Sequence, residues 1–151
     1  MADVLVLVDL VESSVGKPTF ELLTLATRLG TPVAVVVGAI DDASVQELGT
    51  YGAEAVLTAT DDGELRSSVC APVVSLLASL VADRQPIAVL IGSTAQGKEI
   101  AGRLAVRLDA GVLTDAVDVV LDGERVVVEQ SVFGGSTVVH ARTTRGVPII
   151  T

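Results

Sequence analysis

Residues 87–108 have the sequence IAVLIGSTAQGKEIAGRLAVRL, and this stretch decides the fold. Its first part, residues 87–92, is a continuous apolar run, which is typical of a strand buried on both faces of a parallel sheet. A turn of small residues follows, and apolar side chains then recur with helical spacing at Ile100, Ala101, Leu104, Ala105 and Leu108. The stretch therefore predicts a strand, a turn and an amphipathic helix, which form one unit of a parallel α/β sheet.

The turn in this unit has a predicted helix cap. Ser93 is a favourable N-cap residue, and Gln96 three positions later completes the pattern of a capping box. The first N–H groups of such a helix point beyond the end of the strand and carry partial positive charge. We therefore expect this corner to suit an anion or a carbonyl oxygen.

The rest of the chain continues the alternation of strands and helices up to residue 108. Apolar runs predict strands at residues 4–8, 33–37 and 55–57. Helices are expected to begin near Pro18, Asp41 and Pro72, with a loop at residues 61–63. This order predicts a doubly wound, mainly parallel α/β sheet with right-handed crossovers. Ligands of such sheets bind where the strand order reverses, which we expect between residues 8–9 and residues 91–92.

The last third of the chain has a different apolar period. From residue 117 the period falls from 3.6 to 2, which predicts an antiparallel hairpin over residues 117–130 with its turn at Asp122-Gly123. Further strands are expected at residues 137–142 and 147–150. We expect this antiparallel C-terminal hairpin region to extend or cross the parallel sheet.

Composition limits the classes of function. The 151 residues favour a single domain, and 19 acidic against 10 basic residues give a net charge of -9. The absence of a Lys/Arg run and an aromatic share of 2% argue against a nucleic-acid groove and against an anionic membrane surface. Cys70 is the only cysteine, no secretory signal precedes the first strand, and no apolar run reaches the ~20 residues of a membrane span. These features predict a cytoplasmic protein without membrane insertion.

Residues 92–99 resemble a phosphate-binding loop. They fit the pattern G-x-x-x-x-G-K, but the eighth position is Glu99 where Ser or Thr would bind magnesium. A carboxylate there would repel the phosphates. The match keeps a phosphate-loop enzyme as one hypothesis, and Glu99 weakens it.

The same corner holds the residues that we consider for a ligand or a partner. Lys98 and Arg103 either serve such a contact or form a solvated helix face, and the position of Lys98 in the first turn favours an acidic neighbour. Asp115 either caps a loop or pairs with Arg103. The candidate set is Gly92, Ser93, Thr94, Gly97, Lys98, Arg103 and Asp115.

No catalytic or metal-binding pattern accompanies these residues. His140 is the only histidine and lies in a strand of period 2, so we expect a structural or surface residue rather than a base or a metal ligand. Cys70 is expected to be a small apolar residue of a helix. We therefore predict no catalytic residue and no metal site.

Four stretches resemble the electron transfer flavoprotein α subunit in the same order and spacing. They are residues 91–108 followed by Asp115, residues 26–30 (ATRLG), residues 131–136 (SVFGGS) and residues 147–151 (VPIIT). The resemblance implies that residues 1–151 are the N-terminal α/β domain of that subunit, without the C-terminal domain that mainly holds FAD. Ser136 stands where the family often has Asn, so no ligand is assigned to it.

The resemblance also implies partners. The family pairs its α subunit with a β subunit and carries electrons from flavin dehydrogenases, such as acyl-CoA dehydrogenases, to a quinone oxidoreductase. By this resemblance the corner of residues 92–103 holds the heterodimer together or shapes the surroundings of the cofactor domain, and the chain itself is no enzyme. An alternative hypothesis from the same fold is a stand-alone adenine-nucleotide-binding module like the universal stress proteins.

Overall fold

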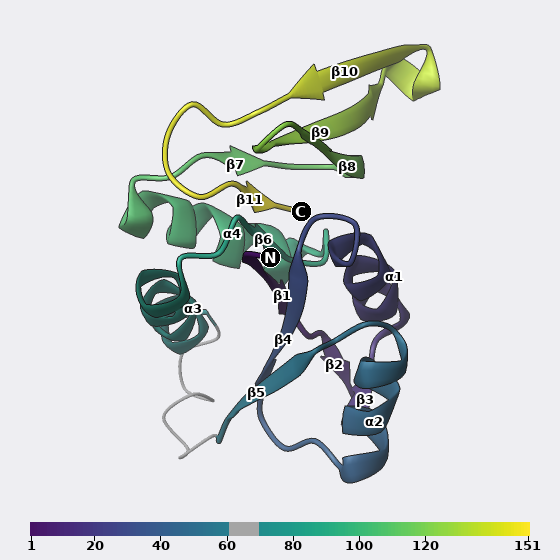
Figure 1. Cartoon of the computed structure of the whole chain (residues 1–151), viewed down its shortest axis with the longest axis vertical. Helices are drawn as coiled ribbons and strands as arrows, with labels where there is room; N and C mark the ends of the chain where they lie inside the picture. The colour runs from purple at the N-terminus through teal and green to yellow at the C-terminus, as the bar shows by residue number, and fades with distance from the viewer. Residues whose placement is uncertain (61–69) are drawn as a thin grey trace.

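The computed structural model describes residues 1–60 and 70–151. Its centre is a six-stranded sheet in the order β5-β4-β1-β6-β11-β7, in which every neighbouring pair is parallel (Figure 1). The strands are β1 (Asp3–Leu7), β4 (Thr31–Val37), β5 (Ala55–Ala59), β6 (Ala88–Leu90), β7 (Val112–Leu113) and β11 (Ile149–Ile150). The mainly parallel α/β class is therefore confirmed, and the predicted loop at residues 61–63 lies outside the described residues.

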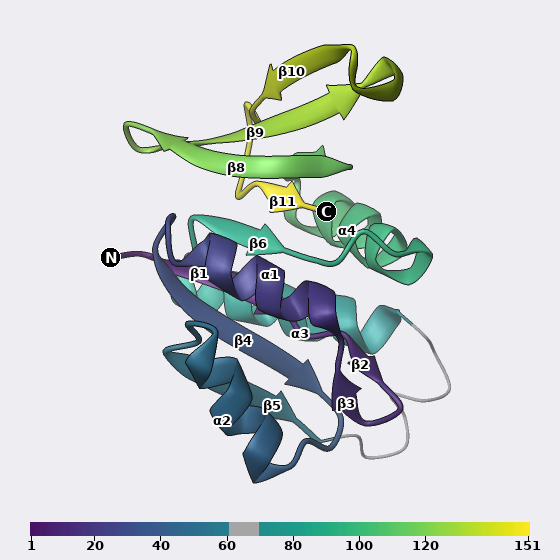
Figure 2. The same ribbon diagram turned by 90° about the vertical axis from the view of Figure 1, so that its right-hand side faces the viewer.

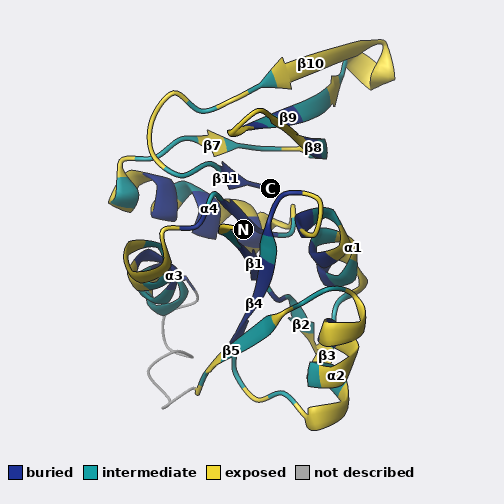
Figure 3. Cartoon of the chain, viewed as in Figure 1, coloured by how far each residue is buried: buried dark blue, intermediate teal, exposed yellow. Residues whose placement is uncertain are grey.

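Helices cover both faces of this sheet. They are α1 (Lys17–Ala26), α2 (Asp42–Thr50), α3 (Ala71–Arg84) and α4 (Ala95–Leu108). Alternate side chains of β1 divide between the two faces, since Val4 and Val6 pack with Leu23 of α1 while Leu5 packs with Leu104 of α4. The sheet is buried on both sides for this reason, and its central strands are dark blue in Figure 3. Continuous apolar strands in the sequence correctly predicted this two-sided burial.

The antiparallel region forms a sheet of its own. It consists of β8 (Ala116–Asp122), β9 (Arg125–Val132) and β10 (Thr137–Ala141), in the order β10-β9-β8, with the 3-10 turn η1 (Phe133–Gly135) between β9 and β10. Val119, Val126 and Val128 pack into the core on the α1 side of the main sheet. The hairpin is confirmed, but of the two expected arrangements the extension of the parallel sheet is wrong, because these strands form a separate sheet, which Figure 2 shows beside the main one. Only β11 returns to the main sheet.

A short hairpin after β1 was not predicted. It joins β2 (Leu10–Val11) to β3 (Ser14–Val15) through Glu12 and Ser13, which both have positive φ angles, of 50° and 70°. Such two-residue turns normally carry Asn or Gly because other side chains are strained there. The sequence therefore gives no turn signal at this place.

Candidate functional site

The candidate corner lies where β6 passes into α4. Thr94 is the N-cap residue, and its Oγ1 accepts a hydrogen bond of 2.9 Å from the N–H of Gly97. The prediction of Ser93 as the cap is wrong by one residue. With Thr94 as the cap, the position of the reciprocal capping-box side chain falls on Gly97, which has none, so the predicted box with Gln96 does not form.

The packing of Gly97 determines where the first turn of α4 begins. A Cβ atom on Gly97 would lie 2.0 Å from the carbonyl oxygen of Gly92, so the first turn of α4 lies directly against the backbone that follows β6. Only a residue without a side chain permits this approach. The two glycines of the candidate set therefore build the corner, and neither offers a side chain to a ligand.

Three candidate side chains come together at the corner: those of Ser93, Lys98 and Asp115. Lys98 Nζ donates to Asp115 Oδ1 at 2.7 Å, and Ser93 Oγ donates to the same oxygen at 3.3 Å. The hydrogen bond and the charge of Lys98 hold the pKa of Asp115 below its ordinary value of 3.8. The acidic neighbour that the position of Lys98 favoured is therefore present. Both side chains stay accessible, with 42% of Lys98 and 67% of Asp115 exposed.

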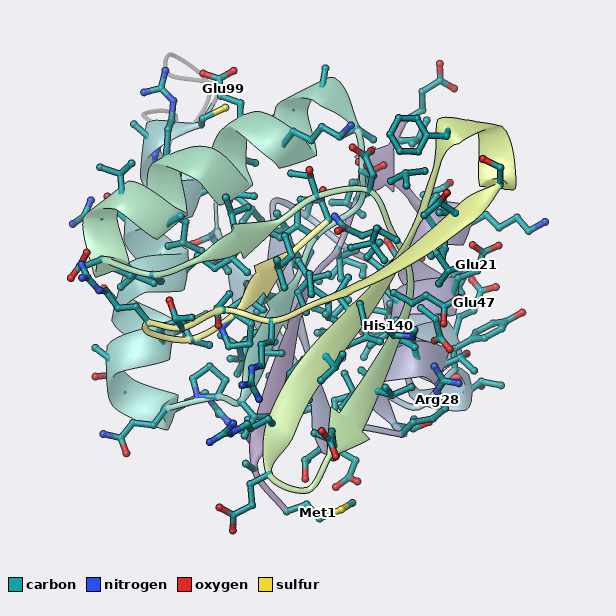
Figure 4. All side chains as sticks on the ribbon, turned by 90° about the horizontal axis from the view of Figure 1, so that it is seen from above. Met1, Glu21, Arg28, Glu47, Glu99 and His140 are labelled. Carbon is teal, nitrogen blue, oxygen red and sulfur yellow. The ribbon has the colours of Figure 1, made fainter. Side chains whose placement is uncertain are left out.

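Arg103 does not join this group. Its guanidinium pairs with Glu99 one helical turn earlier, at 2.8 Å between Nη2 and Oε1, so the predicted alternative of an Arg103–Asp115 pair is wrong. Glu99 is labelled in Figure 4, where it projects outward from α4. Since α4 rotates by about 100° per residue, positions 98 and 103 point in different directions.

A cavity of about 250 Å³ opens beside the corner, at the carboxyl ends of β1 and β6. Asp9 and Leu10 line it from the side of β1, and Gly92, Thr94 and Ile100 from the side of β6 and α4. The strand order reverses between these two neighbouring strands. The cavity lies at the switch point where a ligand site was expected, and the binding of a ligand there stays a prediction.

The geometry of the turn argues against the phosphate-loop hypothesis. Only residues 91–94 separate β6 from α4, and Gly97 and Lys98 already belong to the helix. A phosphate-binding loop needs its glycine-rich residues outside the helix, so that their N–H groups can surround the phosphates. Here the N–H of Gly97 is engaged by Thr94.

The two other residues singled out in the sequence lie away from the corner. His140 is 63% exposed on β10, with Nε2 at 3.5 Å from Glu129 Oε2, so its assignment as a surface residue is confirmed. Cys70 is buried, as predicted for an apolar role, but it lies at the N-cap of α3 and not within a helix. Burial raises the pKa of its thiol. The described part of the chain contains no group of three or more His, Cys, Asp or Glu residues that would hold a metal ion.

The sequence analysis did not predict the hydrogen bonds that Arg28 makes to the small sheet. Arg28, just after α1, donates to the carboxylate of Asp118 and to the carbonyl of Val119 in β8, and so ties the small sheet to the α1 side of the molecule. The partners are separated by 90 residues, and a single sequence contains no signal for such a pair.

Within the described ranges, no helix has both the length and the apolar character needed to span a membrane.

Comparisons with known proteins give matches over nearly the whole chain. Residues 4–151 match the family described as "Electron transfer flavoprotein domain". The electron transfer flavoprotein subunit alpha of Mycobacterium leprae (strain TN) is 43% identical over 153 aligned residues, which cover 100% of this chain and 47% of that protein. The protein of the same name from Bacillus subtilis (strain 168) is 30% identical, covering 87% of this chain and 41% of that protein. The chain thus spans about half the length of the curated relatives it matches.

Proposed function

The chain belongs to the electron transfer flavoprotein family, and on this basis we propose that it is the N-terminal α/β domain of an α subunit that assembles with a β subunit. The observation that carries the proposal is the match of residues 4–151 together with 43% identity over the full chain to a protein named as an α subunit. Relatives about twice as long support a further domain in the complete subunit. In this proposal that further domain mainly holds the FAD.

The volume of the cavity at the carboxyl ends of β1 and β6 supports the proposal that a further domain holds the FAD. Its volume of about 250 Å³ is below the 300–1,000 Å³ of pockets that hold drug-sized ligands, and FAD is larger than such ligands. Asp9 also places a carboxylate in the lining, where it would repel a pyrophosphate. The residues at this position do not fit a flavin dinucleotide, so no step of electron transfer is assigned to them.

The outer face of the small sheet is the surface that we assign to the β subunit. Val120 is opposite Val127, and Val138 is opposite Ser131, so Val120 and Val138 lie on one face of the sheet. Their exposed fractions are 44% and 52%, and the nearby Phe133 is 84% exposed. A sheet face with exposed apolar side chains is typical of a protein interaction surface. The buried residues Val126 and Val128 point to the opposite side.

The polar corner has a second role in the proposal. The Ser93, Lys98 and Asp115 side chains lie at the carboxyl edge of the sheet, where they contact the β subunit or the cofactor-holding domain. Gly92, Thr94 and Gly97 shape the backbone behind them, and Arg103 braces α4 through Glu99. The whole carrier then takes electrons from flavin dehydrogenases, including acyl-CoA dehydrogenases, and delivers them to a quinone oxidoreductase of the respiratory chain. It operates in the cytoplasm and does not itself convert a substrate.

Co-expression with the cognate β subunit tests the assembly. Native mass spectrometry should show a one-to-one complex, and Val138→Asp should weaken it, because a carboxylate would be buried without a partner in the interface. Val106→Asp on α4 is the matched control, since Val106 is 85% exposed and lies outside the small sheet. A chain that stays alone beside a folded β subunit would contradict the proposal, as would stoichiometric flavin bound to residues 1–151 alone.

One second candidate function is the binding of an adenine nucleotide by the isolated chain, which the position of the cavity favours although its volume and Asp9 oppose it. The cavity has the position that ligands take in doubly wound sheets. Calorimetry with AMP and ATP separates the two functions, because micromolar binding favours the nucleotide module and absence of heat favours the subunit.

A further inference from the structure

A second cleft lies at the other end of the parallel strands, between the main sheet and the small sheet. Its volume is about 760 Å³. Apolar walls come from the segment that leads into β6, from α4 and from the segment that leads into β11, with Ile87, Leu108 and Val147 as examples. Arg125 at the start of β9 and Arg142 just after β10 line the same cleft. A cleft with apolar residues and two arginines in its lining is thus present at a place that the proposed function does not use.

These two arginines differ from the other arginines that the structure describes. Every other one has a partner within the chain: Arg28 with Asp118, Arg84 with Asp3, Arg103 with Glu99, Arg107 with Ser75 and Arg145 with Asp109. Arg125 and Arg142 make no hydrogen bond or ion pair with any described residue. The chain has nearly twice as many acidic as basic residues, so unpaired arginines do not result from a shortage of carboxylates.

The two arginines come from neighbouring strand ends. Arg125 begins β9, and Arg142 follows Ala141, the last residue of β10. Both line the same cleft, so one anion bound there can pair with both guanidinium groups and offset the repulsion between them.

The chemistry of the cleft indicates what would bind there. Guanidinium groups present forked donors that match the oxygens of a phosphate or a carboxylate. The volume lies within the range for small organic ligands, and the apolar walls would cover a hydrocarbon body. Glu124 also lines the cleft, and its carboxylate opposes a highly charged ligand. We propose that this cleft binds a small organic oxyanion, with Arg125 and Arg142 holding its phosphate or carboxylate head and the apolar walls holding its body.

Heteronuclear NMR titration of the 151-residue chain tests the site with three probes. Octyl phosphate, kept below its micelle concentration, should shift the amide signals of residues 125, 142 and 147. Inorganic phosphate should bind at least about tenfold more weakly, because it lacks the apolar body. Octyl glucoside, which is neutral, should not shift these signals. Equal binding of octyl phosphate and octyl glucoside, or no binding of octyl phosphate, would overturn the proposal.

Substitutions show whether Arg125 and Arg142 bind the anion specifically or whether the loss of any positive charge weakens binding. Arg125→Gln and Arg142→Gln should each weaken octyl phosphate binding about tenfold, which corresponds to the loss of one charge-assisted hydrogen bond. Arg107→Gln removes the same charge outside the cleft and should leave the affinity unchanged. Glu124→Gln should strengthen binding several-fold, since it removes the opposing carboxylate. Equal affinity in the wild type and both arginine variants, or equal weakening by Arg107→Gln, would show that the cleft is not the site.

Discussion

Lys98 and Asp115 form an ion pair of 2.7 Å that joins the first turn of α4 to the two-residue connection between β7 and β8. Asp115 has a positive φ of 56°, which turns the chain from the parallel sheet into the antiparallel one. The pair therefore connects the two sheets at the edge where the candidate corner lies.

Substitution of Lys98 by Met should raise the pKa of Asp115 toward its ordinary value. The physical reason is that the hydrogen bond and the charge of Lys98 stabilise the ionised carboxylate. A carbon-detected NMR titration of the Asp115 carboxyl group measures the change directly. An unchanged pKa in the variant would show that the pair does not persist in solution.

The Lys98–Asp115 pair should also make the free energy of unfolding depend on pH. Because the pKa of Asp115 is lower in the folded than in the unfolded state, the stabilisation is present above the ordinary value of 3.8 and is lost as the pH falls through the folded-state value. The difference in urea midpoint between the wild type and Lys98→Met should thus be present at pH 6 and vanish in strong acid. A difference that persists at low pH would point to packing of the Lys98 stem instead.

The cap of α4 can be located by a pair of alanine substitutions. Thr94→Ala should lower the free energy of unfolding by about 1 kcal/mol, since the N–H of Gly97 loses its acceptor. Ser93→Ala is the matched control and should cost less than about 0.5 kcal/mol, as usual for an exposed position without a cap. Urea denaturation measures both, and the reverse order would restore Ser93 as the cap.

Two glycines of α4 should respond in opposite directions to alanine. Gly97→Ala should destabilise the protein by about 1–3 kcal/mol, because its Cβ would lie 2.0 Å from the carbonyl oxygen of Gly92. Gly102→Ala should stabilise it by up to about 1 kcal/mol, because a Cβ atom there would meet no described atom within 4 Å beyond its chain neighbours and the adjacent helix backbone, and alanine is the better helix former. Thermal unfolding of both variants checks the prediction. Similar shifts of the same sign would contradict the close approach at Gly97.

The thiol of Cys70 should react slowly in the folded protein. It is 4% exposed, and burial raises its pKa, so little thiolate is available at neutral pH. Reaction with an aromatic disulfide reagent should be at least about a hundredfold slower in buffer than in urea, because access requires opening of the fold. Equal rates in the two solvents would show that the thiol is accessible in the native state.

The parallel sheet was predictable because its strands carry an unambiguous signal. Runs such as residues 4–8 and 33–37 are apolar at every position, which only burial on both faces accounts for. The hairpin around Asp122-Gly123 was predictable from its turn chemistry. The small hairpin at Glu12-Ser13 was not, since its strained turn carries neither Gly nor Asn.

The corner was predicted in position but not in its contacts. Sequence spacing places Lys98 in the first turn of a helix, yet it does not show that Asp115 returns to that turn, because this depends on the path of β7. Neighbouring Ser93 and Thr94 are both good caps, and the choice between them depends on the packing of Gly97 against Gly92. Local preference alone cannot decide such a choice.

The position of β11 has a consequence for how the protein forms during synthesis. Among the described strands, β7 pairs in the main sheet with β11 alone, and β11 also pairs with β6, which precedes it by about 60 residues. A ribosome-bound chain shorter than residue 149 therefore leaves β7 without a neighbour and leaves one edge of β6 open. Pairing over such a sequence distance closes late and slowly. Completion of the main sheet beyond β6 must therefore wait until residues 149–150 have left the exit tunnel.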